Sequence, residues 1–390
     1  MNSKKYERKH REDRPVVAIC YDFDKTLSPD DMQAQGYIQS VGRDVPEFWQ
    51  ESNSLAADNE MDQNLAYMMV MKENAEGKVL FTKDGLKKYG AQVQLFPGVE
   101  EWFERIRAYG QDKGVIVEHY VISSGLKEMI EGTAVAKSFE KIYASSFYYN
   151  ERNVAVWPAQ VVNYTNKTQF LFRIEKGVLD INDPAVNDPF SPEDVRVPFR
   201  NMIYIGDSDT DIPCMKLVNS YGGHSIGVYN NTTKDKTKVY KMMRDGRIKY
   251  YVPADYTEGK EMDVLVKSII DRTVANENLE KLYTRYKIEA EDADKKSNDE
   301  ERRKTNLIIA LENSGSFAST HTAISALKDV GSWTDEEKEA LFNIAIENSQ
   351  VRYILRDSDV ERFYKSLLNN QNNLTANAQK VKDILEGNKD

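Results

Sequence analysis

Residues 15–27, PVVAICYDFDKTL, decide the expected fold. Pro15 to Tyr21 form a short, nearly continuous apolar run with several β-branched residues, as in a strand buried on both faces of a parallel sheet. The run ends directly at a segment that contains Asp22 and Asp24. Open α/β sheets bind ligands beyond the carboxyl ends of their strands, so these carboxylates mark an expected site.

Other apolar runs predict further strands of the same sheet. They cover Glu118–Ile122, Asn201–Ile205, His224–Tyr229 and Arg247–Val252. Stretches between several of them, such as Val99–Tyr109 and Lys167–Gly177, have the apolar spacing of helices that pack on a sheet. Strands that alternate with helices predict an α/β fold with a doubly wound parallel sheet.

Residues 28–95 interrupt this alternation, because the first strand is not followed at once by a partner helix. The segment is polar, rich in Met and Gln, and carries helical periodicity, for example over residues 59–76. Phe96-Pro97-Gly98 then marks a turn that returns the chain to the core. We therefore expect an inserted α-helical cap.

The end of the chain predicts a separate helical unit. Thr334, with Glu337 three residues later, forms a capping-box pattern at the start of a helix. A strongly charged stretch before this unit is typical of a solvated helix or linker. The expected division is a flexible arm at 1–14, a core at 15–27 and 96–275, the cap at 28–95, a charged linker or helix at 276–304, and a C-terminal α-helical domain at 305–390.

Charge and composition narrow the classes of partner. The 390 residues include 53 Lys and Arg against 63 Asp and Glu, a formal net charge of −10, which argues against a protein that coats nucleic acid. No stretch approaches the roughly 18 to 20 apolar residues of a membrane span. The N-terminus lacks the pattern of a signal peptide, and Cys20 and Cys214 fit no metal-binding spacing. We expect a cytoplasmic protein with neither a membrane nor a nucleic-acid partner.

A second acidic cluster follows another predicted strand. Gly206-Asp207-Ser208-Asp209-Thr210-Asp211 comes directly after Asn201–Ile205, so it would meet Asp22 and Asp24 at one edge of the sheet. Such a concentration of carboxylates is tolerated when a hard cation neutralises it. Mg²⁺ is the expected cofactor, because it prefers one or two carboxylates together with water and a phosphate oxygen.

These segments resemble the motifs of the haloacid dehalogenase superfamily. Residues 22–27, DFDKTL, are similar to the nucleophile motif DxDxT, and Gly206-Asp207 with Asp211 is similar to the acidic metal motif. Residues 120–125, YVISSG, resemble the hydrophobic strand that ends in Ser or Thr. The resemblance covers residues 15–272 and implies the superfamily's Rossmann-like core.

The resemblance also assigns phosphate-binding residues. Ser123 stands at the matching position of the strand motif, and Ser124 is the second choice. Lys167, at the start of a predicted helix, is taken as the motif lysine, with Lys176 as the alternative. These side chains would hold the phosphoryl oxygens and offset charge that shifts in the transition state.

The acidic residues receive chemical roles from the same resemblance. Asp22 would attack phosphorus and form an aspartyl-phosphate. Asp24 would protonate the leaving oxygen and later deprotonate the hydrolytic water. Mg²⁺ would be held by the side chains of Asp22 and Asp207 and by the backbone carbonyl of Asp24, with Asp211 ordering these ligands.

The insert resembles the α-helical lid of phosphoserine-phosphatase-like members. Asp30 and Asp31 open its first predicted helix, and Asp31 is a candidate for contact with the substrate. The interpretation that these charges only stabilise the helix start remains open. Members that act on phosphoserine use a lid arginine for the substrate carboxylate, but this chain has no arginine between Arg43 and Arg105, which makes phosphoserine a less favoured substrate.

The resulting hypothesis is a Mg²⁺-dependent phosphatase that hydrolyses a small-molecule phosphomonoester. Asp24 favours phosphoryl transfer over dehalogenation, because a halide leaves without a proton. Two alternatives stay open: a phosphotransferase that uses an acceptor other than water, and an interaction or scaffold protein. In the second alternative, the C-terminal helical domain would bind a protein partner or a second copy of the chain.

Overall fold

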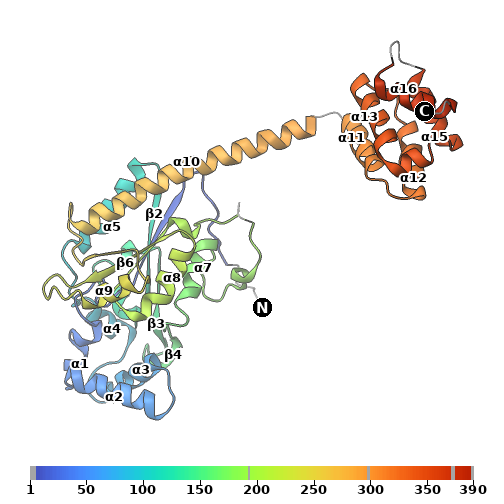
Figure 1. The fold of residues 1–390 in the computed structure, drawn as a ribbon. Helices are drawn as coiled ribbons and strands as arrows, with labels where there is room; N and C mark the ends of the chain where they lie inside the picture. The colour runs from blue at the N-terminus through green and yellow to red at the C-terminus, as the bar shows by residue number, and fades with distance from the viewer. Residues whose placement is uncertain (1–5, 192–193, 297–298, 370–373, 388–390) are drawn as a thin grey trace. The chain divides into compact units, whose positions relative to one another are not determined.

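The computed structural model describes residues 6–191, 194–296, 299–369 and 374–387, and it divides into two compact units, Met1–Lys281 and Leu282–Asp390 (Figure 1). The division falls inside the stretch expected as a charged linker or helix. That stretch is helical where it is described, because α10 spans Glu261–Lys296 and α11 begins at Asp299. None of the described helices combines the length and the apolar character that crossing a membrane requires.

The first unit is built on a seven-stranded sheet with the strand order β4-β3-β2-β1-β5-β6-β7. The strands are β1 Val16–Tyr21, β2 Ile116–Leu126, β3 Lys141–Tyr149, β4 Ala155–Gln160, β5 Met202–Gly206, β6 His224–Tyr229 and β7 Tyr250–Pro253. All neighbours pair in parallel except β3 and β4, which are antiparallel. This confirms the doubly wound α/β fold. Strand order reverses at β1, which places its carboxyl end at the topological switch point.

Alternate residues of β1 point into two separate hydrophobic layers. Ile19 and Tyr21 pack with α5 (Val99–Asp112) and the start of α10, whereas Ala18 and Cys20 pack with α7 (Thr168–Lys176) and α8 (Ile212–Ser220). Every residue of β1 is therefore buried, as the unbroken apolar run predicts. The remaining helices of the unit outside the cap are α6 Lys127–Gly132, α9 Thr237–Arg244 and the short 3₁₀ segments η2 Ala136–Ser138, η3 Pro184–Asn187, η4 Phe199–Asn201 and η5 Asp209–Asp211.

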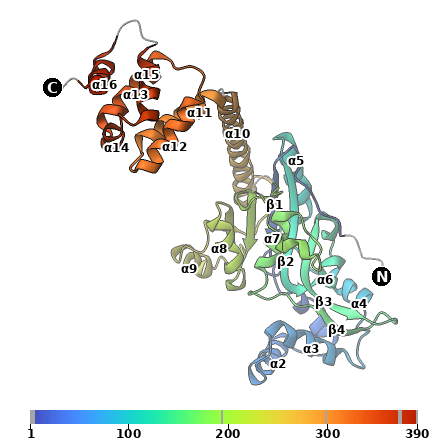
Figure 2. The same ribbon diagram turned by 90° about the vertical axis from the view of Figure 1, so that its right-hand side faces the viewer.

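The segment between β1 and α5 is helical, as expected. It contains η1 Met32–Ala34, α1 Tyr37–Ser40, α2 Val45–Asp58, α3 Gln63–Ala75 and α4 Lys83–Gly90. Figure 2 shows α2 and α3 beyond the end of the sheet, beside β4. The helix α4 packs closely on α6, because a Cβ on Gly90 would lie 1.9 Å from the carbonyl oxygen of Met129, and one on Gly132 would lie 2.1 Å from that of Lys87. This close approach holds the cap against the core.

The sequence did not predict β3 and β4, which form one edge of the sheet. The strand β4 has a buried residue only at Ala155, and it carries Pro158, so it lacks the apolar run of a central strand. Its partner β3 alternates less regularly than a half-buried strand does. The strand β3 pairs with β2, and the formation of an edge hairpin of this kind depends on that pairing. Its own sequence pattern therefore indicates it only weakly.

Residues 6–14, the described part of the expected flexible arm, contact the core. The backbone N–H of Lys9 donates to the carbonyl of Gly177 at 2.9 Å, and the Lys9 ammonium lies 2.7 Å from the Glu118 carboxylate. Glu12 pairs with Arg196 at 2.5 Å. Residues 1–5 lie outside the described residues. The contacts give the arm a place at the amino end of β1 and β2.

The second unit is helical and has its own hydrophobic core. Its further helices are α11 Asp299–Glu312, α12 Phe317–Lys328, α13 Asp335–Glu347, α14 Ser349–Tyr353, α15 Ser358–Leu368 and α16 Ala376–Glu386. Leu341, Phe342 and Phe363 are among the buried side chains. The capping box at the start of α13 is confirmed, because Thr334 accepts from the N–H of Glu337 and Glu337 accepts from that of Thr334.

Candidate active site

A cavity of about 510 Å³ lies where β1, β2 and β5 end. Most of the residues expected in the site line it, namely Asp22, Asp24, Asp31, Ser123, Ser124, Lys167 and Asp207. Asp211 is fully buried next to this lining. Lys176, the alternative to Lys167, instead donates to the carbonyls of Val186 and Asp188. Residues far apart in the chain therefore meet at the predicted edge of the sheet.

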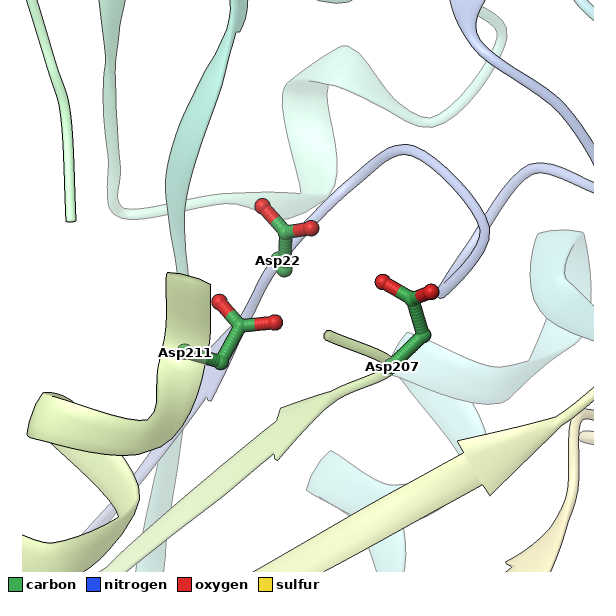
Figure 3. A group of neighbouring side chains, drawn as sticks. All are labelled: Asp22, Asp207 and Asp211. Carbon is green, nitrogen blue, oxygen red and sulfur yellow. The ribbon is translucent and has the colours of Figure 1, made fainter. Parts of the chain in front are cut away.

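Three carboxylates gather at the strand ends, as Figure 3 shows. Asp22 follows β1 and Asp207 follows β5, and these two strands pair in parallel with Tyr21 opposite Ile205. The N–H of Asp22 extends the pairing by donating to the carbonyl of Ile205 at 2.9 Å. Each of Asp22, Asp207 and Asp211 contributes one carboxylate oxygen to a group in which the three oxygens all lie within 4.8 Å of one another. The parallel register thus brings together groups that repel one another.

Asp211 is held by donors on both of its oxygens. Its Oδ1 accepts from the Lys167 ammonium at 2.8 Å and from the Tyr204 hydroxyl at 2.9 Å, and its Oδ2 accepts from the N–H and hydroxyl of Ser208, each at 3.2 Å. A Cβ on Gly206 would lie 2.5 Å from Asp211 Oδ2, so a larger residue here would push the Asp211 carboxylate out of place. Asp211 is therefore fixed as a support for the lysine.

Lys167 is buried and bridges two of the carboxylates. Its ammonium lies 3.0 Å from Asp22 Oδ1 and 2.8 Å from Asp211 Oδ1. Burial alone would lower the pKa of Lys167, but the charges of Asp211 and Asp22 outweigh it and hold the pKa above its usual value. The side chain therefore stays cationic across the physiological pH range.

Two of the three carboxylates have raised pKa values. Burial, followed by the charge of Asp211, raises the pKa of Asp22 to about 7. Burial also raises the pKa of Asp207 to about 6, although the Lys238 ammonium 3.3 Å away opposes this. The positive charges of Lys167 and Lys238 do not balance the negative charges of the three carboxylates. A divalent cation would therefore find oxygen ligands and uncompensated negative charge here.

Asp24 is partly buried beside the opening of the cap. Its Oδ1 accepts from the N–H of Met32 at 2.8 Å. Burial, and then the charge of Asp31, raises the pKa of Asp24 well above its ordinary value. The next residue, Lys25, adopts φ of 59° and pairs with both oxygens of Asp31 at 2.9 and 2.8 Å. Asp24 is thus suited to hold a proton next to the cavity.

The two serines of β2 differ in their surroundings. Ser123 is buried, and its hydroxyl oxygen accepts from the N–H of Gly125 at 3.0 Å, which leaves its proton free to be donated. Ser124 contributes its backbone carbonyl, which accepts from the Tyr67 hydroxyl at 2.7 Å and from the Ser145 hydroxyl at 3.1 Å. Tyr67 belongs to α3, so this hydrogen bond joins the cap to the core.

Several residues of the cavity were not predicted from the sequence. They are Lys25, Asp62, Gln63, Asn64, Asn163, Tyr164 and Lys238 on the lining, and Tyr204 behind Asp211. Asp62 carried a usable signal, since an Asp before a helical run is a typical N-cap. Lys238 and Asn163 carried none, because they reach the site only through long-range contacts.

The chain is similar to known proteins over the part that builds this cavity. Residues 19–216 match the family model of haloacid dehalogenase-like hydrolases. An uncharacterised protein of Borreliella burgdorferi is 24% identical over 281 residues, which cover 63% of this chain and 94% of that protein.

Solved structures show more distant similarity. A haloacid dehalogenase (HAD) family hydrolase from Salmonella enterica serovar Typhi is 17% identical, with a TM-score of 0.44 over 66% of this chain and 72% of that one. A probable phosphoserine phosphatase from Vibrio cholerae is 13% identical, with a TM-score of 0.45 over 68% of this chain and 67% of that one. The family match, which spans both acidic clusters, is the stronger of these findings.

Proposed function

This chain belongs to the haloacid dehalogenase-like hydrolases, and we propose that it is a Mg²⁺-dependent phosphatase that hydrolyses a small-molecule phosphomonoester. The observation that carries the proposal is the position of Asp22. It is a buried carboxylate at the switch point of the sheet, with a lysine 3.0 Å away, two further carboxylates around it and a cavity in front of it. These are the groups that attack on phosphorus requires.

The first step forms a bond between an Asp22 carboxylate oxygen and phosphorus, while the bond from phosphorus to the ester oxygen breaks. Asp24 gives its proton to the departing oxygen, which then leaves as an alcohol. The raised pKa of Asp24 supports this assignment, because the acid must be protonated when the substrate binds. The products of this step are the alcohol and an aspartyl-phosphate on Asp22.

The second step returns the enzyme to its starting state. Asp24, now a carboxylate, takes a proton from water, and the water oxygen attacks phosphorus and releases phosphate from Asp22. Throughout both steps, Lys167 and the Ser123 hydroxyl donate to the phosphoryl oxygens. Asp211 positions Lys167 and does not need to touch the substrate itself.

The carboxylates fit a magnesium ion. Asp22 and Asp207, with the backbone carbonyl of Asp24, would hold it, and oxygen ligands of this number and charge suit Mg²⁺. Its positive charge would allow a phosphate dianion to approach Asp22, which otherwise stands among like charges. Asp211 has both oxygens occupied by donors, so we assign it to the support of this group.

The proposal is tested by phosphate release from an aryl phosphate. We expect Asp22→Asn to lower kcat by at least about 10⁴-fold, because the amide cannot form the acyl phosphate. Chelation of divalent metal should abolish the activity of the wild type, and added Mg²⁺ should restore it.

A matched control is Asp209→Asn. Asp209 is an exposed acid two residues after Asp207, at the start of η5, and it does not line the cavity. This variant should keep the activity of the wild type. Turnover that persists in Asp22→Asn or after chelation would refute the proposal.

A further inference from the structure

One wall of the cavity comes from the cap and faces whatever carries the phosphoryl group. We name it the cap wall and define it as Asp31, Asp62, Gln63 and Asn64 of the cap with Asn163 and Tyr164 of the core. The amide of Asn163 donates to Asp62 at 2.7 Å, and the amide of Asn64 donates to the carbonyl of Val162 at 2.9 Å. These hydrogen bonds close the wall between the cap and the core.

The positive charges on the cavity lining are already paired. The described lining contains three lysines, Lys25, Lys167 and Lys238, and no arginine. Each lysine lies within 3.3 Å of a carboxylate oxygen, Lys25 with Asp31, Lys167 with Asp22, and Lys238 with Asp207. An anionic group on the substrate, other than the phosphate, would therefore meet no unpaired cation on the described lining.

Asp62 adds a negative charge whose hydrogen-bond partners among the described residues are neutral. Its Oδ1 accepts from the N–H groups of Asn64 and Leu65 at 2.8 and 3.1 Å, and its Oδ2 accepts from the amide of Asn163. The N-terminus of a helix ordinarily attracts anions. Here the α3 terminus is occupied by its own Asp62 carboxylate, so a substrate carboxylate would face like charge in place of free N–H donors.

We infer that the cap wall, in the phosphatase proposed above, selects phosphomonoesters whose leaving group carries an ammonium group and rejects those that carry a carboxylate. An ammonium group beside Asp62 gains a charge partner, and the neighbouring Gln63 and Asn64 on the cavity lining carry amide oxygens that can accept from it. The ring of Tyr164, which is 57% exposed, offers a further surface for a cation. A carboxylate at the same place would face the charge of Asp62, and each lysine on the described lining already has a carboxylate partner.

The test uses three esters that differ only at the end of one short chain: 2-aminoethyl, 2-hydroxyethyl and 2-carboxyethyl phosphate. With Mg²⁺ present, we expect kcat/KM to be at least about tenfold higher for the amine than for the carboxylate, with the alcohol between them. This is the size of effect expected from the interaction of one charge on the ester with one partly exposed carboxylate.

Asp62→Asn should reduce the ratio of amine to carboxylate by about tenfold. Asn is also a good N-cap, so α3 keeps its start. Asp44→Asn is the matched control, because Asp44 is the N-cap of the neighbouring cap helix α2 and does not line the cavity. It should leave the ratio unchanged. If Asp62→Asn fails to fold by circular dichroism, the order of the three esters in the wild type decides.

Binding separates this inference from the proposed function. The three esters are titrated calorimetrically into Asp22→Asn. Binding in the order amine, alcohol, carboxylate without turnover by the wild type would refute the phosphatase and keep the charge selection. Turnover with an equal or faster carboxylate ester, or a ratio that is the same in folded Asp62→Asn, would refute the charge selection and keep the phosphatase.

Discussion

Carboxylates are buried near both ends of β2, but their pKa values are shifted in opposite directions. At its carboxyl end, Asp22, Asp207 and Asp211 crowd together and the pKa of Asp22 rises to about 7. At its amino end, Glu118 accepts from Lys9 at 2.7 Å and from two nitrogens of Arg196 at 2.7 and 2.8 Å. Burial would raise the pKa of Glu118, but Arg196 and Lys9 outweigh it and lower the pKa to about 2.

The ion pairs around Glu118 stabilise the fold, whereas the carboxylates around Asp22 are arranged for the proposed chemistry. At the amino end, Arg196 and Lys9 supply Glu118 with cationic donors, and these ion pairs fix the arm on the core. The carboxyl end leaves negative charge that the protein does not compensate. The unbalanced charge of the sheet thus lies where the proposed metal ion and phosphoryl group would bind.

The largest effect that tests this contrast is expected for Lys167→Met. The variant should lose about 10²- to 10³-fold in kcat, because a donor to the phosphoryl oxygens is removed. It should also lose about 3 kcal/mol of unfolding free energy at pH 7, because Asp22 and Asp211 stay buried without their cation.

The pH dependence of this stability loss identifies its cause. Burial raises the pKa of Asp22, so in Lys167→Met this carboxylate binds its proton more tightly when folded than when unfolded, and the loss should shrink as the pH falls from 7 to 5. Urea unfolding at several pH values measures it. A loss that is independent of pH would point to packing and not to charge.

A smaller effect, confined to stability, is expected for Glu118→Gln. The folded pKa of Glu118 is about 2 against an ordinary value of 4.5, so its contribution is complete above pH 4.5 and disappears as the pH falls toward 2. At pH 7 the variant should lose about 3 kcal/mol of unfolding free energy and retain the proposed phosphatase activity.

The matched control at this end is Glu140→Gln. Glu140 pairs with the same Lys9 at 2.8 Å but is partly exposed, so its removal should cost less than about 1 kcal/mol. If Glu118→Gln lowered kcat as strongly as Lys167→Met, the two ends of the sheet would not be functionally distinct.

The two ends also differ in how far the sequence predicts them. The carboxyl end follows from local patterns, because each acidic cluster stands directly after an apolar run, and parallel strands place such clusters at one edge. The amino end joins Lys9, Glu118 and Arg196, which lie far apart in sequence and in segments without a motif. No local pattern indicates that these side chains meet.

The contacts of the cap with the core are likewise not predictable from local sequence patterns. The helical character of the cap follows from periodicity, whereas the N-cap of α3 at Asp62 was not predicted, although Asp is a typical residue at this position. The meeting of Asp62 with Asn163 depends on how the cap packs on the core, which a single sequence does not specify. The edge strands β3 and β4 were missed for a related reason, since they depend on pairing with β2.

The central claim is that Asp22 carries the phosphoryl group during turnover. Its most direct test is an acid quench of the wild type during hydrolysis of an aryl phosphate with Mg²⁺, followed by mass spectrometry of the protein and its peptides. We predict one added phosphoryl group on the peptide that contains Asp22, and none in Asp22→Asn. Phosphate release at full rate with an unmodified Asp22 throughout the time course would contradict the account.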